Sequence, residues 1–201
     1  FISFIVFPVF SINKFNPSKI NYYKQTIIKE KYNIKENSFV VGYCGRLVRD
    51  KGIIELVSSI TSLQKKHNIQ LLLVGDFEER DQLPTDIIEI IENNSGIIKT
   101  GFIYEDIEYF YSLMNLFILP SFREGFPTSV LEASSMGIPV LTTKATGCID
   151  SIVEGITGFY IENSADSISS KILKIINQKN AKEIGLNGRE FVLNNFDNRL
   201  L

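Results

Sequence analysis

The chain has 201 residues, of which 44% are hydrophobic and 22% are charged, and its formal net charge is −2. This length suits one globular domain, or one domain with a small appendage. The small net charge gives no argument for a nucleic acid or an anionic membrane as partner. Two cysteines, Cys44 and Cys148, are too few for a disulfide framework and stand in no metal-ligand spacing, which favours the cytosol.

The first ten residues, FISFIVFPVF, are apolar, but a membrane-spanning helix needs about 20 such residues. The segment also lacks the basic start and the small-residue cleavage site of a signal peptide. We interpret it as a strand or a linker remnant, and we expect an exposed apolar patch that favours self-association. Residues 13–20 predict a turn that leads into a helix near residues 18–31.

Short apolar runs alternate with amphipathic stretches along the rest of the chain. The apolar runs predict strands at residues 39–44, 69–75, 96–102, 116–120, 138–143 and 158–161. The amphipathic stretches predict helices at residues 52–67, 85–94, 104–114, 129–136, 165–178 and 181–195. Apolar strands that alternate with helices are typical of a parallel sheet covered on both faces. We therefore predict an α/β fold, a Rossmann-like doubly wound sheet, in which ligands bind beyond the carboxyl ends of the strands.

The loop CGRLVRDKG, residues 44–52, follows the first of these strands. Gly45 allows a tight backbone turn, and Arg46 and Lys51 flank a loop that enters a helix near Gly52. A helix N-terminus presents free N–H groups and a positive dipole, so with two cations it suits a diphosphate. The alternative is that these cations are solvated loop charges. Gly75 and Asp76 end a strand at the same edge, where a plain turn and a ligand role fit equally well.

Two carboxylates, Glu124 and Glu132, stand eight positions apart after the strand at 116–120. Ser129-x-x-Glu132 fits a capping box, which explains Glu132 structurally but leaves Glu124 and the Gly-Phe-Pro turn at 125–127 unexplained. Gly125 would let backbone N–H groups approach a ligand. The chain has neither a G-x-G-x-x-G nor a P-loop pattern. The residues alone predict a site for a phosphorylated, hydroxyl-rich ligand and no particular reaction.

Four segments together carry a resemblance to a known family. GRLVRDKG, LLLVGDFEERD, LPSFREGFPTSVLEASSMGIPVL and TGCIDSIVEGITGFYI resemble the nucleotide-sugar-binding half of retaining GT-B glycosyltransferases of family four. The similarity is to bacterial capsular-polysaccharide and lipopolysaccharide sugar transferases, from about residue 38 to 196. The resemblance implies a nucleotide-sugar-binding domain at 38–201. Residues 1–37 would be a helix and the linker or remnant of an N-terminal acceptor domain, which we expect to be missing.

The resemblance also implies residue roles. Arg46 and Lys51 would bind the donor diphosphate and stabilise the leaving nucleoside diphosphate without a metal or other cofactor. Glu124 would face the donor sugar and the transition state, and Glu132 would accept hydrogen bonds from the ribose. The two glutamates would form the family's E-x7-E motif. The other donor-binding positions would be Gly45, Gly75, Phe102, Ile103, Gly125, Phe126, Pro127 and Thr128, with residues 101–103 near the base.

The implied partners are a nucleotide-sugar, with UDP as the favoured nucleotide, and a lipid-linked or oligosaccharide acceptor. We expect the chain alone to bind donor but to transfer sugar poorly. It would be cytoplasmic, with peripheral contact to the plasma membrane through the missing half. Asn115, Ser135 and Ile149 depart from the family pattern, and Ile149 would remove a contact near the donor.

Two other functions compete with a transferase. One is a nucleotide-sugar-binding module without activity of its own, either a gene remnant or a subunit of a split transferase. The other is a GT-B epimerase acting on UDP-N-acetylglucosamine, against which the E-x7-E motif together with GRLVRDKG argues.

Overall fold

The computed structural model describes residues 11–196, so the expectations for the apolar segment 1–10 lie outside the described residues. Its centre is a six-stranded sheet in the order β3-β2-β1-β4-β5-β6. Every neighbouring pair of strands is parallel. The strands are β1 (Phe39–Cys44), β2 (Ile69–Val74), β3 (Ile97–Lys99), β4 (Leu116–Leu119), β5 (Val140–Thr142) and β6 (Gly158–Tyr160). The predicted fold class is confirmed.

Helices follow the strands in the predicted order. They are α1 (Tyr22–Lys31), α2 (Ile53–Gln64), α3 (Thr85–Asn93), α4 (Ile107–Ser112), α5 (Thr128–Ser135), α6 (Ala165–Asn177) and α7 (Ala181–Asn195). The helix expected from residue 18 is divided, because a short 3-10 turn at Pro17–Lys19 ends in extended backbone at Ile20 before α1 begins. The helix expected from residue 104 begins at Ile107, because Asp106 lies in the left-handed region with φ 62°.

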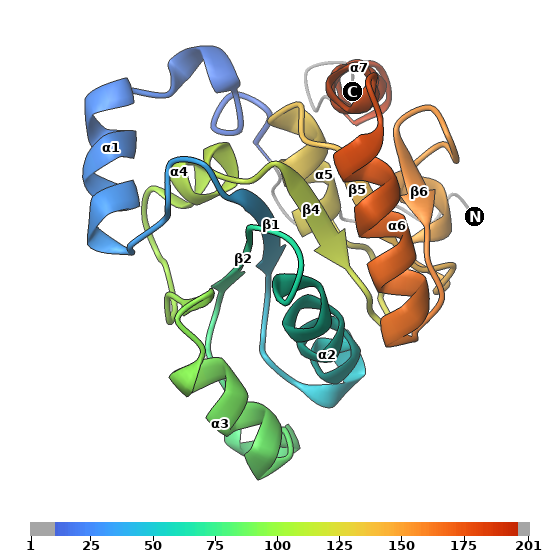
Figure 1. The fold of residues 1–201 in the computed structure, drawn as a ribbon. Helices are drawn as coiled ribbons and strands as arrows, with labels where there is room; N and C mark the ends of the chain where they lie inside the picture. Colours follow the sequence, from blue (N-terminus) through green and yellow to red (C-terminus); the bar gives the residue numbers. More distant parts are fainter. Residues whose placement is uncertain (1–10, 197–201) are drawn as a thin grey trace.

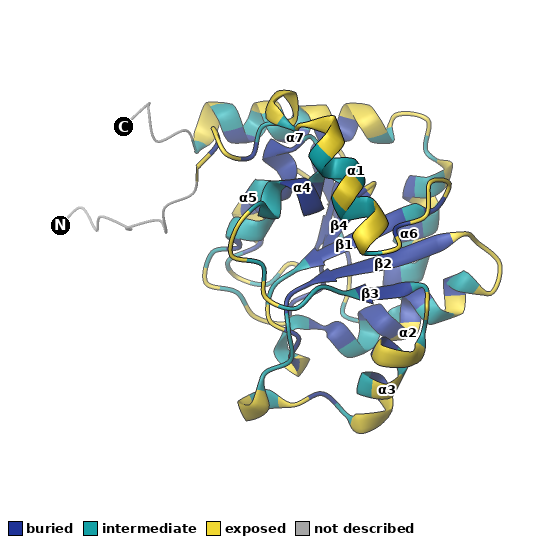
Figure 2. Cartoon of the chain, turned by 90° about the vertical axis from the view of Figure 1, so that its left-hand side faces the viewer, coloured by how far each residue is buried: buried dark blue, intermediate teal, exposed yellow. Residues whose placement is uncertain are grey.

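The helices form a layer on each face of the sheet (Figure 1). Helix α2 packs against α3 and α6, and the hydroxyl oxygens of Ser59 and Ser169 lie 2.9 Å apart between α2 and α6. On the other face, α4 contacts α1 and α5, and α5 contacts α7. Figure 2 shows the buried strands between these layers, with exposed residues on the outer sides of the helices. Every residue of β2 is buried, as expected for an inner strand covered on both faces.

The strand order reverses between β1 and β4. From β1 the chain moves outward through β2 and β3, then returns to the other side of β1 and continues outward through β4, β5 and β6. In doubly wound sheets, such a reversal opens a crevice at the carboxyl ends of the two central strands. The loops that follow β1 and β4 are therefore the first place to look for a binding site.

The N-terminal part of the described chain shares the core of the sheet domain. Ile12, Phe15 and Ile34 are buried within the same hydrophobic cluster as the strands. Arg189 on α7 donates hydrogen bonds to the carbonyl oxygen of Phe15 at 3.3 Å and to that of Ser135. The core therefore continues across residues 37 and 38, where the sequence suggested a division.

Candidate functional site

Three glycines bring the turns after β1, β2 and β3 close together. Gly45 and Gly75 have φ values of 152° and 150°. A Cβ atom added to Gly75 would lie 1.9 Å from the carbonyl oxygen of Gly45, and Gly75 forms a bridge with Gly101. A side chain at Gly75 would force the turns after β1 and β2 apart. The structure therefore brings together Gly45 and Gly75, two of the expected donor-binding residues, at the carboxyl edge of the sheet.

Lys51 and Glu124 meet across the reversal point. Lys51 ends a 3-10 turn in the loop after β1, and Glu124 lies in the loop after β4. The Lys51 Nζ atom lies 2.7 Å from the Glu124 Oε1 atom, and the two side chains are only 17% and 12% exposed. Gly52, with φ 69°, lets the first loop approach, because a Cβ there would lie 2.1 Å from the Pro120 carbonyl oxygen.

Further contacts fix these two loops and the loop after β5. The Arg123 guanidinium pairs with Asp50 at 2.8 Å, and the Phe122 N–H donates to the Asp50 carbonyl at 2.9 Å. The Thr143 hydroxyl donates to the Ser121 carbonyl at 2.6 Å. These contacts fix the positions of the loops that carry Lys51 and Glu124.

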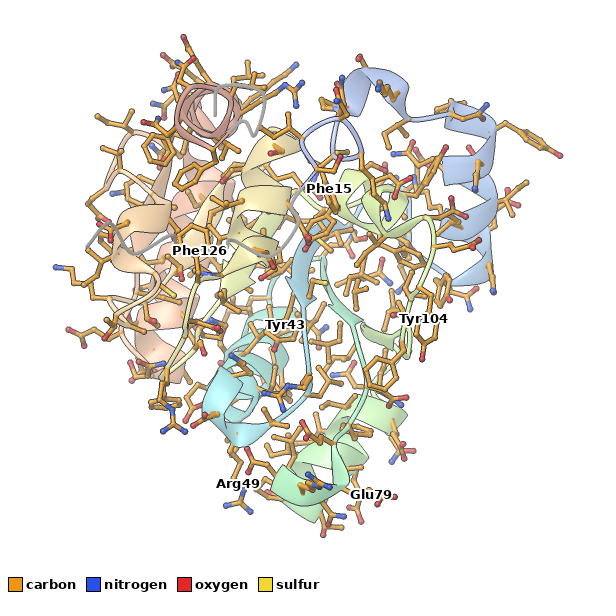
Figure 3. The ribbon with its side chains drawn as sticks, turned by 180° about the vertical axis from the view of Figure 1, so that it is seen from behind. Phe15, Tyr43, Arg49, Glu79, Tyr104 and Phe126 are labelled. Atoms are coloured by element: carbon orange, nitrogen blue, oxygen red, sulfur yellow. The ribbon has the colours of Figure 1, made fainter. Side chains whose placement is uncertain are left out.

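Arg46 reaches the same edge but has a different partner. Its guanidinium pairs with the Glu78 carboxylate at 2.5 Å, and the side chains are 59% and 30% exposed. The Tyr43 hydroxyl donates to the Arg46 carbonyl at 2.8 Å from the interior of the molecule, where Figure 3 shows it. Sequence reasoning missed Glu78, although its place beside Glu79 in the loop after β2 marks an acidic turn at the correct sheet edge.

Glu132 does not form the capping box that its spacing from Ser129 suggested. Helix α5 begins at Thr128, and its N-cap residue, Pro127, has no side-chain cap hydrogen bond. Instead the Tyr111 hydroxyl donates to the Glu132 Oε2 atom at 2.6 Å. Burial raises the pKa of the Glu132 carboxyl group above its usual range. Sequence reasoning missed Tyr111, since nothing in its own segment marks it as more than a core aromatic residue.

The turn at residues 125–128 joins Glu124 to the start of helix α5. Gly125 is exposed and Pro127 is buried. The Phe126 ring, labelled in Figure 3, packs on Phe196. The two ring centroids are 5.7 Å apart. A Cβ on Gly147 would lie 2.0 Å from the Gly125 carbonyl oxygen, so the loop after β5 rests directly on this turn. The Phe126 and Pro127 side chains are therefore used in packing, and we expect the backbone of this turn to meet a ligand.

The loop after β3 carries the remaining expected residues. Phe102 is 59% exposed, Ile103 is half-buried, and both follow Gly101, whose φ is 72°. Tyr104 is also exposed, at the margin of the molecule in Figure 3. Beside them Lys99 pairs with Asp76 at 2.9 Å, and this hydrogen bond lowers the pKa of the Asp76 carboxyl group. Ile149, the departure from the family pattern, is exposed in a short 3-10 turn.

Within residues 11–196, no group of three or more His, Cys, Asp or Glu side chains is arranged to hold a metal ion. Over the same residues, no helix is long and apolar enough to cross a membrane. The chemistry present at the edge is that of paired charges and backbone N–H groups. Such groups bind anions and stabilise negative charge as it develops.

A parallel doubly wound sheet with a charged pair at its reversal point defines a Rossmann-like ligand-binding domain. Residues 24–191 match the model of the family described as "Glycosyl transferases group 1", so the chain belongs to that family. It is 37% identical over 178 residues to a capsular polysaccharide biosynthesis glycosyltransferase, CapM, of Staphylococcus aureus, covering 87% of this chain and 47% of that protein. It is 27% identical to a lipopolysaccharide 1,2-N-acetylglucosaminetransferase of Salmonella typhimurium, covering 86% and 48%.

Solved structures of glycosyltransferases superpose on this chain over most of its length. A glycosyltransferase from Rickettsia africae superposes with a TM-score of 0.83 at 28% identity, over 92% of this chain and 51% of that one. The C-terminal domain of a group 1 glycosyl transferase, LpcC, from Francisella tularensis has a TM-score of 0.77 at 24% identity, over 92% and 97%. The chain spans about half the length of the curated relatives it matches, and its resemblance to glycosyltransferases of capsule and lipopolysaccharide synthesis is confirmed.

Proposed function

We propose that this chain is the donor-binding half of a retaining glycosyltransferase that moves a sugar from a nucleotide-sugar, with UDP as the favoured nucleotide, to a polysaccharide or lipid-linked acceptor. The observation that carries this proposal is the Lys51–Glu124 pair at the reversal point. It sets a cation and a carboxylate side by side where a doubly wound sheet binds its ligand. The relatives named for capsule and lipopolysaccharide synthesis support the same reaction class.

The reaction separates charge, and the residue types at the edge fit each part of it. Breaking the bond between the sugar and the diphosphate leaves negative charge on the diphosphate, while the sugar becomes cationic. Lys51, Arg46 and backbone N–H groups at the start of α5 supply fixed positive charge for the diphosphate. Glu124 takes the sugar hydroxyls and Glu132 the ribose hydroxyls. No step in this scheme uses a metal ion.

Both cations have carboxylate partners in the free protein, so donor binding needs an exchange of partners. Lys51 leaves Glu124, and Arg46 leaves Glu78, when the diphosphate arrives. The freed Glu124 carboxylate then meets the sugar. The ion pair between residues 51 and 124 thus holds both groups at the place where they act.

The acceptor site belongs to a second half of the transferase, because this chain spans only about half of its relatives. We propose that the chain alone binds donor and transfers sugar poorly, and that the transferase works in the cytoplasm with peripheral membrane contact. A chain that binds donor but transfers little sugar would behave like the nucleotide-sugar-binding module named above as an alternative. Transfer to a lipid-linked acceptor by this chain at a rate typical of a complete transferase would contradict this part of the proposal.

Calorimetric titration with UDP, GDP and ADP tests the donor site. GDP is the competing nucleotide, because one relative at 29% identity is named a GDP-mannose-dependent alpha-mannosyltransferase. One nucleotide should bind, and a double variant, Arg46→Ala with Lys51→Ala, should weaken it roughly tenfold or more through two lost charge-assisted hydrogen bonds. Lys65→Ala with Lys66→Ala is the matched control, because both residues are exposed at the other end of α2. Equal loss in both double variants would contradict the proposed site.

A further inference from the structure

The hydroxyl group of a buried tyrosine contacts Glu132, the carboxylate that we propose binds the ribose. Tyr111 is on α4 and is fully buried. Its ring packs between Phe15 and Phe117, with centroid distances of 5.6 and 5.7 Å. Its hydroxyl reaches from this apolar setting to the Glu132 Oε2 atom on α5, at 2.6 Å. A hydroxyl in such a position needs a partner, because an unpaired buried polar group is costly.

Cys44, at the end of β1, is another titratable group near Tyr111. Burial raises the pKa of the Cys44 thiol to about 12, so the thiol keeps its proton at neutral pH. Tyr111 has one proton to donate and gives it to the Glu132 carboxylate. The hydroxyl hydrogen of Tyr111 is therefore directed toward Glu132.

The hydrogen bond from Tyr111 constrains the Glu132 carboxylate in two ways. It engages the Oε2 atom and leaves the Oε1 atom for other donors, which fixes the rotation of the group. Burial favours the neutral carboxyl group, while the hydrogen bond from Tyr111 acts in the opposite direction and lowers the pKa of Glu132. A neutral carboxyl group would be a poorer acceptor for ribose hydroxyls than the ionised one.

We propose that Tyr111 is a positioning residue that aims the Glu132 carboxylate at the ribose hydroxyls of the donor nucleotide. The inference rests on the proposed function, in which Glu132 accepts hydrogen bonds from the ribose hydroxyls. Tyr111 does not touch the ligand and acts through Glu132. Its contribution is confined to the ribose and leaves the binding of base and diphosphate unchanged.

A pair of nucleotides isolates this contribution. Calorimetry compares UDP with 2′,3′-dideoxy-UDP, or GDP with its dideoxy form if GDP is the nucleotide bound. The wild-type chain should prefer UDP, and Glu132→Ala should remove most of that preference. Tyr111→Phe keeps the ring and removes only the hydroxyl. We expect it to reduce the preference by roughly three- to tenfold, the scale of a hydrogen bond to a charged group acting indirectly, and to leave the dideoxy affinity unchanged.

A second measurement separates positioning from packing. The titratable groups that face Glu132 are Tyr111 on α4, Cys44 at the end of β1 and Lys14 in the N-terminal segment. Without the Tyr111 hydrogen bond, Glu132 takes up its proton at higher pH. The pH at which the preference for UDP over dideoxy-UDP is lost should therefore move upward in Tyr111→Phe. Both nucleotides carry the same diphosphate, so the effect of its ionisation cancels in the ratio of the two affinities.

Tyr109→Phe is the matched control, since Tyr109 is a buried tyrosine of the same helix whose ring lies under Lys24. It should change neither the preference nor its pH dependence. An unchanged preference in Tyr111→Phe, or equal loss of both nucleotides, would overturn the positioning role while leaving the donor site intact. A wild-type chain that binds the two nucleotides equally would overturn it as well. A wild-type chain that binds no nucleotide would overturn the proposed function with it.

Discussion

Lys51 and Glu124 stand 73 residues apart in the chain, yet their side chains form an ion pair of 2.7 Å across the point where the strand order reverses. Both side chains are largely shielded from water, so the attraction between them is stronger than in an exposed pair. The free protein therefore holds its best-placed cation against a carboxylate. An arriving diphosphate competes with Glu124 for Lys51.

Removing that competition should strengthen the binding of the nucleotide without its sugar. Glu124→Gln keeps the shape of the side chain and removes its negative charge beside the diphosphate. We expect UDP to bind roughly three- to tenfold more tightly, as measured by calorimetry at low salt. Glu79→Gln is the control, because Glu79 is exposed at the periphery of the molecule (Figure 3). Weaker binding of UDP to Glu124→Gln would mean that Glu124 supports the diphosphate rather than competing with it.

Glu78 should also compete with the diphosphate, in this case for Arg46, but its effect on UDP affinity should be smaller than that of Glu124. The Arg46 side chain is 59% exposed, so solvent already screens its attraction to Glu78. We expect Glu78→Gln to raise the affinity for UDP by about twofold at low ionic strength, and the gain to disappear at high salt. Titration at two salt concentrations checks this result. A gain that persists at high salt would point to a change in loop structure rather than in charge.

Glu132 should cost stability at neutral pH. Its pKa in the folded protein is raised by burial, so the stability it contributes is present at pH below its unfolded-state pKa and is lost as pH rises through the folded-state pKa. Glu132→Gln should therefore raise the Tm at neutral pH, and the gain should vanish near pH 4. For a chain of this size, about 1 kcal/mol corresponds to roughly 2–4 °C. Ser129→Ala should leave the Tm nearly unchanged, because Ser129 forms no capping box.

Arg189 should be important for the attachment of the N-terminal segment. Its guanidinium donates to the carbonyl oxygens of Phe15 and Ser135 and to the Asn16 side chain. Arg189→Met keeps most of the apolar stem and removes the three hydrogen bonds that the guanidinium donates, which we expect to cost about 2–3 kcal/mol. Urea unfolding measures the loss. Arg80→Met, at an exposed arginine, is the control, and an equal midpoint for both variants would contradict the role of Arg189.

The fold could be predicted from the sequence because inner parallel strands are apolar on both faces. β1 and β2 lie within one residue of the predicted ranges. β3 was predicted at 96–102 but pairs only over Ile97–Lys99, because Gly101 turns out of the strand with φ 72°. Apolar character shows that a strand exists, whereas its end depends on the pairing of backbone groups with a neighbour.

The site could be predicted only in part. Strand ends of a parallel sheet share one edge, so the loops after β1 and β4 were correctly brought together. The side-chain partners of the site residues could not be predicted from the sequence. Glu132 fits a local capping pattern, but helix α5 begins one residue earlier and the carboxylate meets Tyr111 from another helix. Arg46 likewise pairs with Glu78, a contact that depends on how two turns stack.

A crystal structure of the chain with UDP would test the central claim most directly. We expect the diphosphate beside Lys51 and the start of α5, with the ribose hydroxyls at Glu132 and the Lys51–Glu124 pair opened. The described part of the chain also has a cavity of about 610 Å³ at the opposite edge of the sheet, lined by Phe39, Asn115 and Pro139 among others. UDP bound there, or bound with the pair between Lys51 and Glu124 intact, would contradict a donor site at the reversal point.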